Sequence, residues 1–428
     1  MSTRAKKPGI RFAGFEDEWA KKKFDDVFDM LSNNTLSRDA LNSENGAAKN
    51  IHYGDVLTKF GEYLDVSSAK LPFISDPAIA TKFVRSYLKD GDIVIADTAE
   101  DETVGKCTEV IGVEETPVIA GLHTMPCRPK EKYAPKYMGY YLNSNAYHDN
   151  LFPLMQGVKV TSISRTGVKE TEVILSTNFE EQEKIGEHLS SLDNMIALET
   201  AKHEKLIIIK KAMLEKMFPK EGCDVPELRF GDYTGAWEQR KLSEFGQATG
   251  GTSIESEFSE VGIYKVISIG SYSEDSIYRD QGIRAVRSDK TENRILNKGD
   301  ITMILNDKTA SGNIIGRVLL IEESGVYVYN QRTERIEVDR SNYDSQFIYT
   351  MLNAPDIRDK IIKQSQGNTQ IYINWKTVSQ TDYLVPQINE QRKIGEYFSN
   401  LNHLITLHQR RLKKLKNIKS ACMEKMFV

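Results

Sequence analysis

The sequence predicts an α+β protein built as an internal repeat, with two globular α/β domains separated by two long antiparallel coiled-coil helices under a pseudo-two-fold symmetry. The first observation is a duplicated motif, Glu-Gln-x-Lys-Ile-Gly, at residues 181–186 and 390–395. The second is that the same residues occur in the same order in both halves, since an Arg-Phe pair and then a Trp precede each copy of the motif. The third is a heptad spacing of hydrophobic residues after each motif, which is typical of a coiled-coil seam.

Length and composition indicate a folded chain. With 428 residues, 39% of them hydrophobic and 28% charged, the sequence has the size of two or three domains with substantial cores. The apolar runs are far shorter than the ~20 residues of a membrane span. No apolar stretch follows the basic start of the chain, so we expect a cytoplasmic protein. A net charge of −4 argues mildly against a nucleic-acid binder, although it does not exclude a local basic patch.

The four cysteines, Cys107, Cys127, Cys223 and Cys422, show no metal-ligand spacing, either among themselves or with histidine. We therefore expect neither a bound metal nor a disulfide framework.

The repeat divides the chain into four parts. We expect a first globular domain at 1–178 and a first spacer helix at 179–220. A second globular domain is expected at 221–387 and a second spacer helix at 388–428.

Within the globular domains, Gly-Asp turns introduce predicted strands at 91–96 and 299–305, and further strands are expected at 317–321 and 326–329. Apolar residues at three- and four-residue spacing predict helices at 133–150 and 345–363. Trp19 and Trp237 hold equivalent places and are expected to anchor the two cores. Trp375 has no such counterpart and is expected at the surface.

The spacer helices carry the heptad seam. Its predicted positions are Ile185, Leu189, Leu192, Ile196 and Glu199 in the first helix, and Ile394, Phe398, Leu401, Ile405 and His408 in the second. In an antiparallel pair the two midpoints meet, so Glu199 is predicted to face His408 in a polar layer that sets the register. The alternative is that both side chains point to solvent.

Opposite charges are concentrated on the two helices. Glutamates at 180, 181, 183 and 187 begin the first helix, and six Arg and Lys residues occupy 410–419 of the second. Antiparallel packing would bring these groups together; the alternative is two solvated faces, since surface ion pairs contribute only ~0–1 kcal/mol each. A helix of roughly 38 residues is ~57 Å long. Two related domains on such a spacer favour a ligand with two half-sites, and DNA is the natural candidate.

The duplicated order of motifs resembles the specificity subunit of type I restriction-modification systems. The resemblance covers nearly the whole chain and rests on the motif that opens each long helix, on the closing Lys-Met-Phe at 216–218 and 425–427, and on a Gly-Asp-Ile strand in each globular part. It implies that each globular part is a target-recognition domain that reads one half of an asymmetric bipartite site in double-stranded DNA. The helices would then set the gap between the half-sites.

The resemblance also implies partners. Two methyltransferase subunits would dock on the helices, and restriction subunits, which are motor nucleases, would complete the complex. S-adenosylmethionine would belong to the methyltransferase, and this chain would bind no cofactor and contain no catalytic residue. Consistent with this, the sequence lacks an Asn-Pro-Pro-Tyr-like tetrapeptide, a glycine-rich nucleotide loop and a Walker A motif. Two alternatives stay open: a decoy or orphan scaffold that recruits no enzyme, and an unrecognised nuclease.

The candidate DNA contacts are polar and basic residues in loops of both domains, because such side chains contact phosphates and base edges. They are Lys159, Ser162, Ser164, Arg165, Arg284, Arg287, Lys290, Lys308, Ser311, Arg317, Asn374 and Lys376. For each of them the alternative is an ordinary solvated loop residue. His52 and His123 could also read DNA, although a structural role is the expectation for both.

Overall fold

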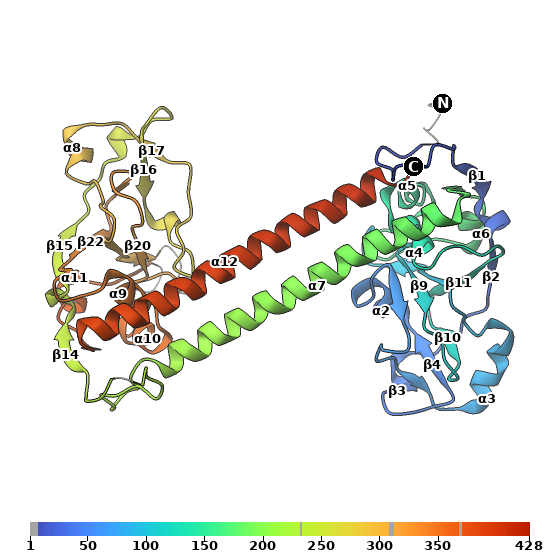
Figure 1. Ribbon diagram of the computed structural model, residues 1–428, viewed down its shortest axis with the longest axis horizontal. Coiled ribbons are helices and arrows are strands. Elements are labelled where there is room, and N and C mark those ends of the chain that lie inside the picture. Colours follow the sequence, from blue (N-terminus) through green and yellow to red (C-terminus); the bar gives the residue numbers. More distant parts are fainter. Residues whose placement is uncertain (1–6, 232, 308–311, 368–369) are drawn as a thin grey trace. The chain divides into compact units, whose positions relative to one another are not determined.

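The computed structural model describes residues 7–231, 233–307, 312–367 and 370–428. Two compact units make up the chain (Figure 1): unit 1 comprises residues 1–200 and 410–428, and unit 2 comprises residues 201–409. Each unit contains a globular part and segments of both long helices, α7 (Phe179–Lys216) and α12 (Ile388–Lys425). The predicted α+β class and its internal repeat are confirmed.

Unit 1 is built on two main sheets. The five-stranded sheet has the order β2 (Phe28–Met30), β11 (Thr124–Pro129), β7 (Ile93–Ala96), β9 (Cys107–Ile111), β5 (Tyr63–Asp65), and the four-stranded sheet has the order β10 (Val118–Ala120), β4 (Ala48–Ile51), β6 (Phe73–Ile74), β3 (Leu41–Asn42). Two short ladders pair β1 (Ala20–Lys23) with β13 (Glu172–Leu175) and β8 (Thr98–Ala99) with β12 (Thr161–Ser162). The helices are α1 (Phe24–Val27), α2 (Tyr53–Thr58), α3 (Pro77–Ala80), α4 (Tyr137–Asn143), α5 (Asn145–His148) and α6 (Arg165–Lys169).

Unit 2 repeats this plan with smaller sheets. The four-stranded sheet has the order β15 (Gly246–Gly250), β22 (Thr333–Val338), β18 (Ile301–Ile304), β20 (Val318–Leu320), and a three-stranded sheet has the order β17 (Arg284–Ala285), β16 (Tyr264–Ile267), β21 (Tyr327–Tyr329). The ladders pair β14 (Glu238–Lys241) with β24 (Asp382–Val385) and β19 (Asn306–Asp307) with β23 (Ile371–Tyr372). The helices are α8 (Asp289–Glu292), α9 (Ser345–Leu352), α10 (Pro355–Ile362) and α11 (Trp375–Val378).

The Gly-Asp motif fixes the central strand of each unit by the same ion pair. Asp92 precedes β7 and accepts hydrogen bonds from Nε and Nη2 of Arg128 on the neighbouring β11. Asp300 precedes β18 and accepts from Nε of Arg335 on β22, at 2.8 Å. Each aspartate also accepts a backbone N–H from three residues earlier, at 2.8 Å. The motif therefore closes a turn and aligns two antiparallel strands.

A side-chain amide joins sheet to helix at the same place in both units. Asn143 at the end of α4 binds the backbone N–H and C=O of Cys107 on β9, and Asn353 after α9 binds those of Val318 on β20. These paired hydrogen bonds align α4 with α9 and β9 with β20 residue by residue. Positions in the two units can therefore be compared directly.

Two of the three tryptophans anchor the hydrophobic cores. Trp19 and Trp237 are buried in the cores of units 1 and 2, as predicted. Trp375 is half-buried and packs against the unit 2 core, so the expectation of a surface residue is wrong.

The single helices predicted at 133–150 and 345–363 are also wrong in extent. Each breaks into two, at Ser144 with extended backbone and at Ala354, where Pro355 begins α10 and cannot continue α9.

The two long helices pack together within each unit. In unit 1, Oδ1 of Asp193 on α7 lies 2.6 Å from Nζ of Lys419 on α12, and Nε2 of His188 lies 3.8 Å from Sγ of Cys422. Because the earlier residue of α7 contacts the later residue of α12, the two helices run antiparallel. In unit 2, Phe218 just after α7 packs on Phe398 of α12. Ile185, Leu189 and Leu192 are buried in unit 1, Ile394, Phe398 and Leu401 are buried in unit 2, and Ile196 and Ile405 are half-buried. Glu199 and His408 belong to different units, and their pairing stays a prediction.

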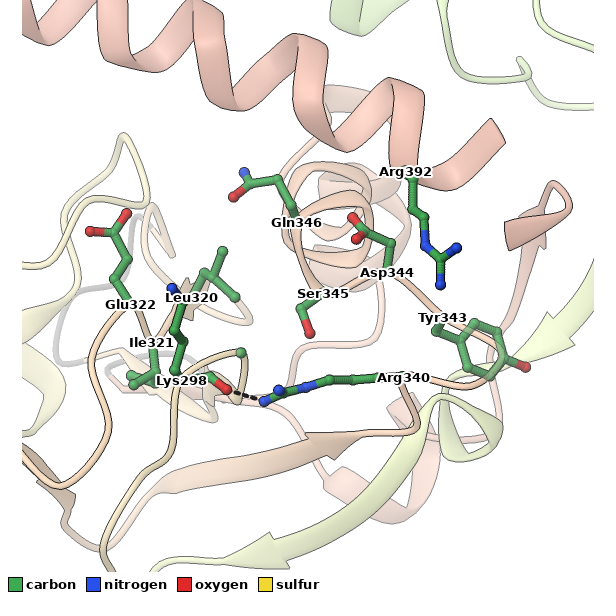
Figure 2. A pocket seen from close by; sticks show the side chains of 11 residues that line it. Lys298, Leu320, Ile321, Glu322, Arg340, Tyr343, Asp344, Ser345, Gln346 and Arg392 are labelled. Atoms are coloured by element: carbon green, nitrogen blue, oxygen red, sulfur yellow. Dashed lines mark hydrogen bonds between the residues drawn. The ribbon is translucent and has the colours of Figure 1, made fainter. Parts of the chain in front are cut away.

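At the start of α9 in unit 2 the surface is hollowed into a cavity of about 710 Å³ (Figure 2). Asp344 caps α9 by accepting the N–H of Phe347 at 2.8 Å, and Arg392 of α12 reaches the same cavity. Arg340 donates to the carbonyl of Lys298 across its floor. The cavity thus belongs to the junction between the globular part and its long helix.

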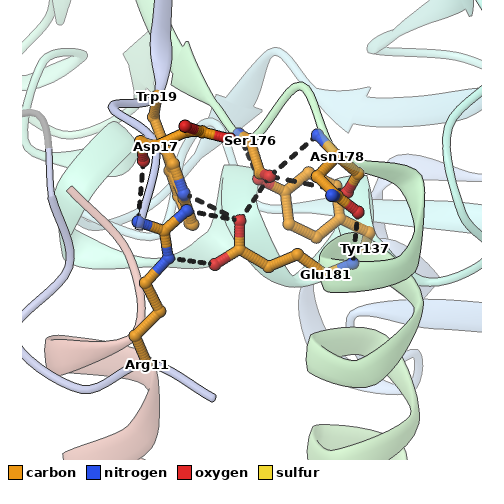
Figure 3. Close-up of polar contacts among 7 residues, drawn as sticks. All are labelled: Arg11, Asp17, Trp19, Tyr137, Ser176, Asn178 and Glu181. Carbon is orange, nitrogen blue, oxygen red and sulfur yellow. Dashed lines mark hydrogen bonds and ion pairs between the residues drawn. The ribbon is translucent and has the colours of Figure 1, made fainter. Parts of the chain in front are cut away.

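The duplicated Glu-Gln-x-Lys-Ile-Gly motif fastens each long helix to its globular part (Figure 3). Glu181 is fully buried and accepts hydrogen bonds from Nε and Nη2 of Arg11, from Nε1 of Trp19 and from Oγ of Ser176. In unit 2, Glu390 accepts from Nε and Nη2 of Arg229, both at 2.7 Å.

The other motif residues fit the same role. Gln182 accepts the N–H of Ala134 and donates to the carbonyl of Ser176, and Gln391 makes the matching bonds in unit 2. A Cβ on Gly186 would lie 2.7 Å from a backbone oxygen, so only glycine permits this approach.

One charge prediction is therefore wrong. Glu181 does not face the basic end of α12, because it is buried against Arg11. Lys419 in turn pairs with Asp193 and Glu62 rather than with the glutamates that begin α7. Burial explains why Glu181 binds Arg11. A carboxylate that is removed from water needs hydrogen-bond donors close to it, and the exposed surface of α12 does not supply them.

Candidate nucleic-acid interface

An exposed hairpin leaves the globular part of each unit at its Gln-Gly pair. In unit 1, Gln156 and Ser162 exchange two backbone hydrogen bonds of 2.9 and 2.8 Å. Gly157 has φ 111°, and a Cβ there would lie 2.0 Å from the carbonyl of Val160. At the tip, Val158 is completely exposed, and Lys159 beside it is exposed as well. The tip thus offers one cation and an apolar side chain to a partner.

Unit 2 forms the same hairpin. Gln366 and Tyr372 exchange two backbone hydrogen bonds of 2.9 Å, and Gly367 has φ 99° with the same close approach of a carbonyl. The side chain of Tyr372 is 43% exposed, which is high for an aromatic ring. Residues 368–369 at the tip lie outside the described part of the chain.

A second shared element is the tight turn that leads into β11 in unit 1 and β22 in unit 2. His123 has φ 54° and Arg332 has φ 67°, and these residues are 209 positions apart in the repeat. The carbonyl of His123 accepts the N–H of Asp97, and the carbonyl of Arg332 accepts the N–H of Leu305. A left-handed conformation is uncommon for residues other than glycine and marks positions held in place by their surroundings.

The turn and the hairpin meet at the same strand end. The N–H of Ile163, after the first hairpin, donates to the carbonyl of Asp97, and the N–H of Ile373 donates to the carbonyl of Leu305. Turn, strand end and hairpin therefore form one backbone framework that is repeated in both units. The exposed side chain in the turn differs, since it is an imidazole in unit 1 and a guanidinium in unit 2.

Polar and aromatic groups surround the turn in unit 1. Nδ1 of His123 lies 3.3 Å from both Oδ1 of Asp97 and Oγ1 of Thr98, and Thr98 belongs to the strand that pairs with the hairpin. The ring of Tyr53 meets His123 edge-on at 5.2 Å and also contacts His52. Burial lowers the pKa of His52, assisted by the nearby Arg38, which favours the neutral ring.

The predicted contacts that follow the hairpins have clear roles within the protein. Arg165 is partly buried and donates to the carbonyl of Leu31 and to Oδ1 of Asn33, so its guanidinium holds the loop that follows β2. Ser164 accepts the N–H of Gly167 as the cap of α6, and Asn374 accepts the N–H of Lys376 as the cap of α11. Lys159, Ser162 and Lys376 are exposed.

The predicted basic stretch of unit 2 lies elsewhere, beside β17 and α8. Arg284 binds Asp280 through both Nη atoms, and this pair lowers the pKa of Asp280 to about 2. Arg287 pairs with Glu292, and Lys290 donates to Ser256. Among the described residues, these three cations bind neighbours of their own region and none binds the hairpin of unit 2.

Three further candidates complete the list. Arg317 is half-buried and donates to the carbonyl of Asn313 and to Ser276, where it lines a cavity of unit 2. Lys308 and Ser311 lie outside the described residues.

Sequence reasoning missed Arg332 because a left-handed turn has no signature without glycine or asparagine. Arg294 belongs to the basic stretch that the sequence indicates in this domain, and it donates to the carbonyl of Gly250 and to Thr252 and lies over the ring of Tyr329. The buried Glu334 lies nearby, and burial raises its pKa to about 7. Internal alignment at the repeat offset was the available signal for Arg332, since it places this arginine at the position of His123.

The described residues offer neither a metal-ligand cluster nor a membrane-spanning helix. Among them, no set of three His, Cys, Asp or Glu side chains is arranged to hold a metal ion. In the same part of the chain, no helix has the length and apolar character needed to cross a membrane.

Comparison with known proteins identifies the class. The family described as type I restriction modification DNA specificity domain matches the chain twice, at residues 16–207 and 235–417. The chain therefore belongs to this family, as a type I restriction-modification specificity subunit with a role in DNA recognition.

Individual relatives are distant. The type I restriction enzyme MjaVIII specificity subunit of Methanocaldococcus jannaschii is 27% identical over 252 residues, which cover 57% of this chain and 58% of that protein. The putative type I restriction enzyme MjaX specificity subunit of the same organism is 22% identical over 419 residues, which cover 95% of this chain and 92% of that protein. The crystal structure of a type I restriction-modification system S subunit from M. genitalium covers 99% of both chains with a TM-score of 0.63 and 15% identity, which shows a common fold.

Proposed function

We propose that each unit reads one half of an asymmetric, bipartite site in double-stranded DNA. The observation that carries the proposal is the repeated framework of hairpin and turn, which is the same in backbone but presents His123 in unit 1 and Arg332 in unit 2. Two domains that recognise different DNA sequences need a common backbone scaffold and different exposed side chains. Guanidinium groups bind guanine in the major groove, whereas imidazole has other preferences, so the two half-sites differ.

In this proposal the long helices set the gap between the half-sites and dock two methyltransferase subunits. Restriction subunits join that complex, and S-adenosylmethionine is bound by the methyltransferase rather than by this chain. The chain itself recognises DNA in the cytoplasm and catalyses no reaction. Support comes from the fastening motif, because Glu181 and Glu390 attach a globular reader rigidly to the start of each helix.

The proposal is tested by mapping DNA methylation in a host that expresses this chain together with its neighbouring methyltransferase subunit. We expect a two-part motif with an unspecified gap to be methylated only when this chain is present. If the two proteins co-purify and no motif appears, the chain is a decoy or orphan scaffold. Binding of the purified chain to the mapped site should also weaken steeply with added salt, because contacts to phosphates release counterions.

A further inference from the structure

Unit 2 contains a cavity of about 650 Å³, partly open to solvent, that the proposed DNA interface does not use. Side chains of α7, α9, α10 and α12 line it, together with loop residues at 274–277 and 312–317. Apolar groups such as Ile207, Ile362 and Phe398 form part of the wall. A volume between ~300 and ~1,000 Å³ with mixed walls is typical of a small-molecule site.

The unusual feature of the cavity is Arg358 on α10. Its side chain is 4% exposed, and among the described residues none accepts a hydrogen bond from its Nε, Nη1 or Nη2. Burial lowers the pKa of Arg358 to about 9, and the nearby Arg317 contributes to that shift. A buried guanidinium with five unused N–H groups is costly, and native proteins almost always pair such a group.

Two more cations that line the same cavity, Lys210 and Arg317, are partly buried. Burial lowers the pKa of Lys210 on α7 and that of Arg317, and Asp275 only partly offsets the effect in each case. The second acid of this loop, Glu274, accepts a hydrogen bond from Asn313. Asp359 also lines the cavity, but it is exposed to solvent and does not bind Arg358.

The matching place in unit 1 shows how the repeat satisfies such groups when no ligand is needed. Lys419 corresponds to Lys210 and binds Asp193 and Glu62, which outweigh burial and raise its pKa. In unit 2, Asn402 stands where unit 1 has Asp193, so one carboxylate is missing.

The other two positions follow the same contrast. Lys106 corresponds to Arg317 and donates to the carbonyl of Leu57 at 2.9 Å. His148 corresponds to Arg358, and its Nε2 lies 2.9 Å from the carbonyl of Val104. The three groups of unit 1 thus all have partners within the protein. Unit 2 instead has Arg358 at the position of His148, and it lacks the carboxylate that Asp193 provides in unit 1.

We propose that this cavity of unit 2 binds a phosphate group, held by Arg358 and Arg317 with Lys210 at its side. The charge of a phosphate dianion matches that of two guanidinium groups. Its oxygens also accept the paired hydrogen bonds that each planar guanidinium group can donate. Its negative charge would also relieve the repulsion between the two arginines. The cavity is larger than inorganic phosphate, and its apolar walls favour the phosphate of a small organic ester.

The test measures ligand binding by the full chain in phosphate-free buffer, without DNA. Adenosine monophosphate, inorganic phosphate and adenosine serve as probes in calorimetric titration and in thermal melting. We expect adenosine monophosphate to raise the melting temperature and adenosine to leave it unchanged. An equal effect of inorganic phosphate would identify the free ion as the ligand, whereas a smaller effect would identify the ester.

Variants assign the binding to the cavity. Arg358→Met should weaken the affinity for adenosine monophosphate at least about tenfold, since it removes charged hydrogen bonds, and Arg358→Lys should weaken it less. Without ligand, Arg358→Met should melt at or above the temperature of the unchanged chain, because an unpaired buried charge is removed. His148→Met, the matched change in unit 1, should leave the affinity unchanged. Absence of binding by both phosphates, or equal binding by Arg358→Met, would overturn the proposal.

Discussion

Arg11 and Glu181 are joined by two hydrogen bonds at the point where the chain enters α7, and the carboxylate is fully buried. The same relationship links Arg229 with Glu390 at the start of α12. The arginine lies near the beginning of each globular part and the glutamate after its last strand. Each pair therefore closes a globular part at its two ends and fixes the direction in which the long helix leaves.

Glu181→Ala should be strongly destabilising. It leaves Arg11, Trp19 and Ser176 without their acceptor, and loss of one partner of a buried ion pair costs about 3–5 kcal/mol. The free energy of unfolding of unit 1, measured by urea denaturation, should fall by that amount. Glu390→Ala should cost less, because Nε1 of Trp237 has no hydrogen-bond partner to lose among the described residues.

Glu180→Ala is the matched control, since Glu180 stands next to Glu181 and pairs with Lys184 on the exposed helix surface. Exposed pairs of this spacing contribute about 0.3–0.5 kcal/mol. Equal losses in Glu180→Ala and Glu181→Ala would contradict the role of the buried pair.

The sequence was sufficient to predict the repeat, the long helices and the central strands, because heptad spacing and Gly-Asp turns are local signals. It was not sufficient for the fate of Glu181, which looks like one of several helix-surface glutamates. Its burial follows from Arg11, some 170 residues away in the chain, and such a contact has no local pattern. The broken helices at Ser144 and Ala354 show the same limit, because apolar spacing continues across both breaks.

For the interface, the Gln-Gly hairpins were located from sequence, whereas the functions of individual side chains were not. Ser164 and Asn374 look like DNA contacts by residue type but cap short helices. Arg165 binds backbone carbonyls of its own unit. Polar residues that follow a loop serve both purposes equally well, and only the surrounding backbone distinguishes them. The DNA contacts at Lys159, Ser162 and Lys376 stay predictions.

Arg332→Ala should change the recognition of one half-site only. A guanidinium that binds a base edge contributes about 1–3 kcal/mol of discrimination, so methylation mapping should show relaxed sequence at one position of the motif. His123→Ala should affect the other half-site, because it holds the matching turn position in unit 1. Lys220→Ala, a change of an exposed residue just after α7, should leave the motif intact. A change in both half-sites for Arg332→Ala would refute independent reading.

Gly157→Ala should distort the hairpin of unit 1. The residue has φ 111°, and the added Cβ would lie 2.0 Å from the carbonyl of Val160, so strain of about 1–3 kcal/mol is expected. Amide hydrogen exchange at Gln156 and Ser162 should accelerate, and affinity for the mapped site should fall. Gly61→Ala is the control, since nothing lies within 4 Å of a Cβ there. Unchanged exchange in Gly157→Ala would exclude the strain.

Glu109 should make the stability of unit 1 depend on pH. It lies on β9 and accepts the N–H of Lys136 and of Gly139 at the start of α4, and burial raises its pKa from 4.5 to about 7. Below pH 4.5 the group is protonated in both the folded and unfolded chain, so its stabilising contribution is complete. As pH rises to 7 the unfolded chain ionises first, and up to about 3 kcal/mol is lost.

Glu109→Gln should therefore flatten the fall in the free energy of unfolding between pH 4.5 and 7, measured by urea denaturation at several pH values. The dependence should decrease without vanishing, because Glu334 in unit 2 has a similarly raised pKa. Glu102→Gln, a change of an exposed carboxylate in the same unit, should leave the profile as it was. Leu320 stands at the position of Glu109 in unit 2, so the contribution of this particular carboxylate to the pH dependence belongs to unit 1. A profile that is equally steep in Glu109→Gln would show that this carboxylate is ionised at low pH, with its backbone donors outweighing its burial.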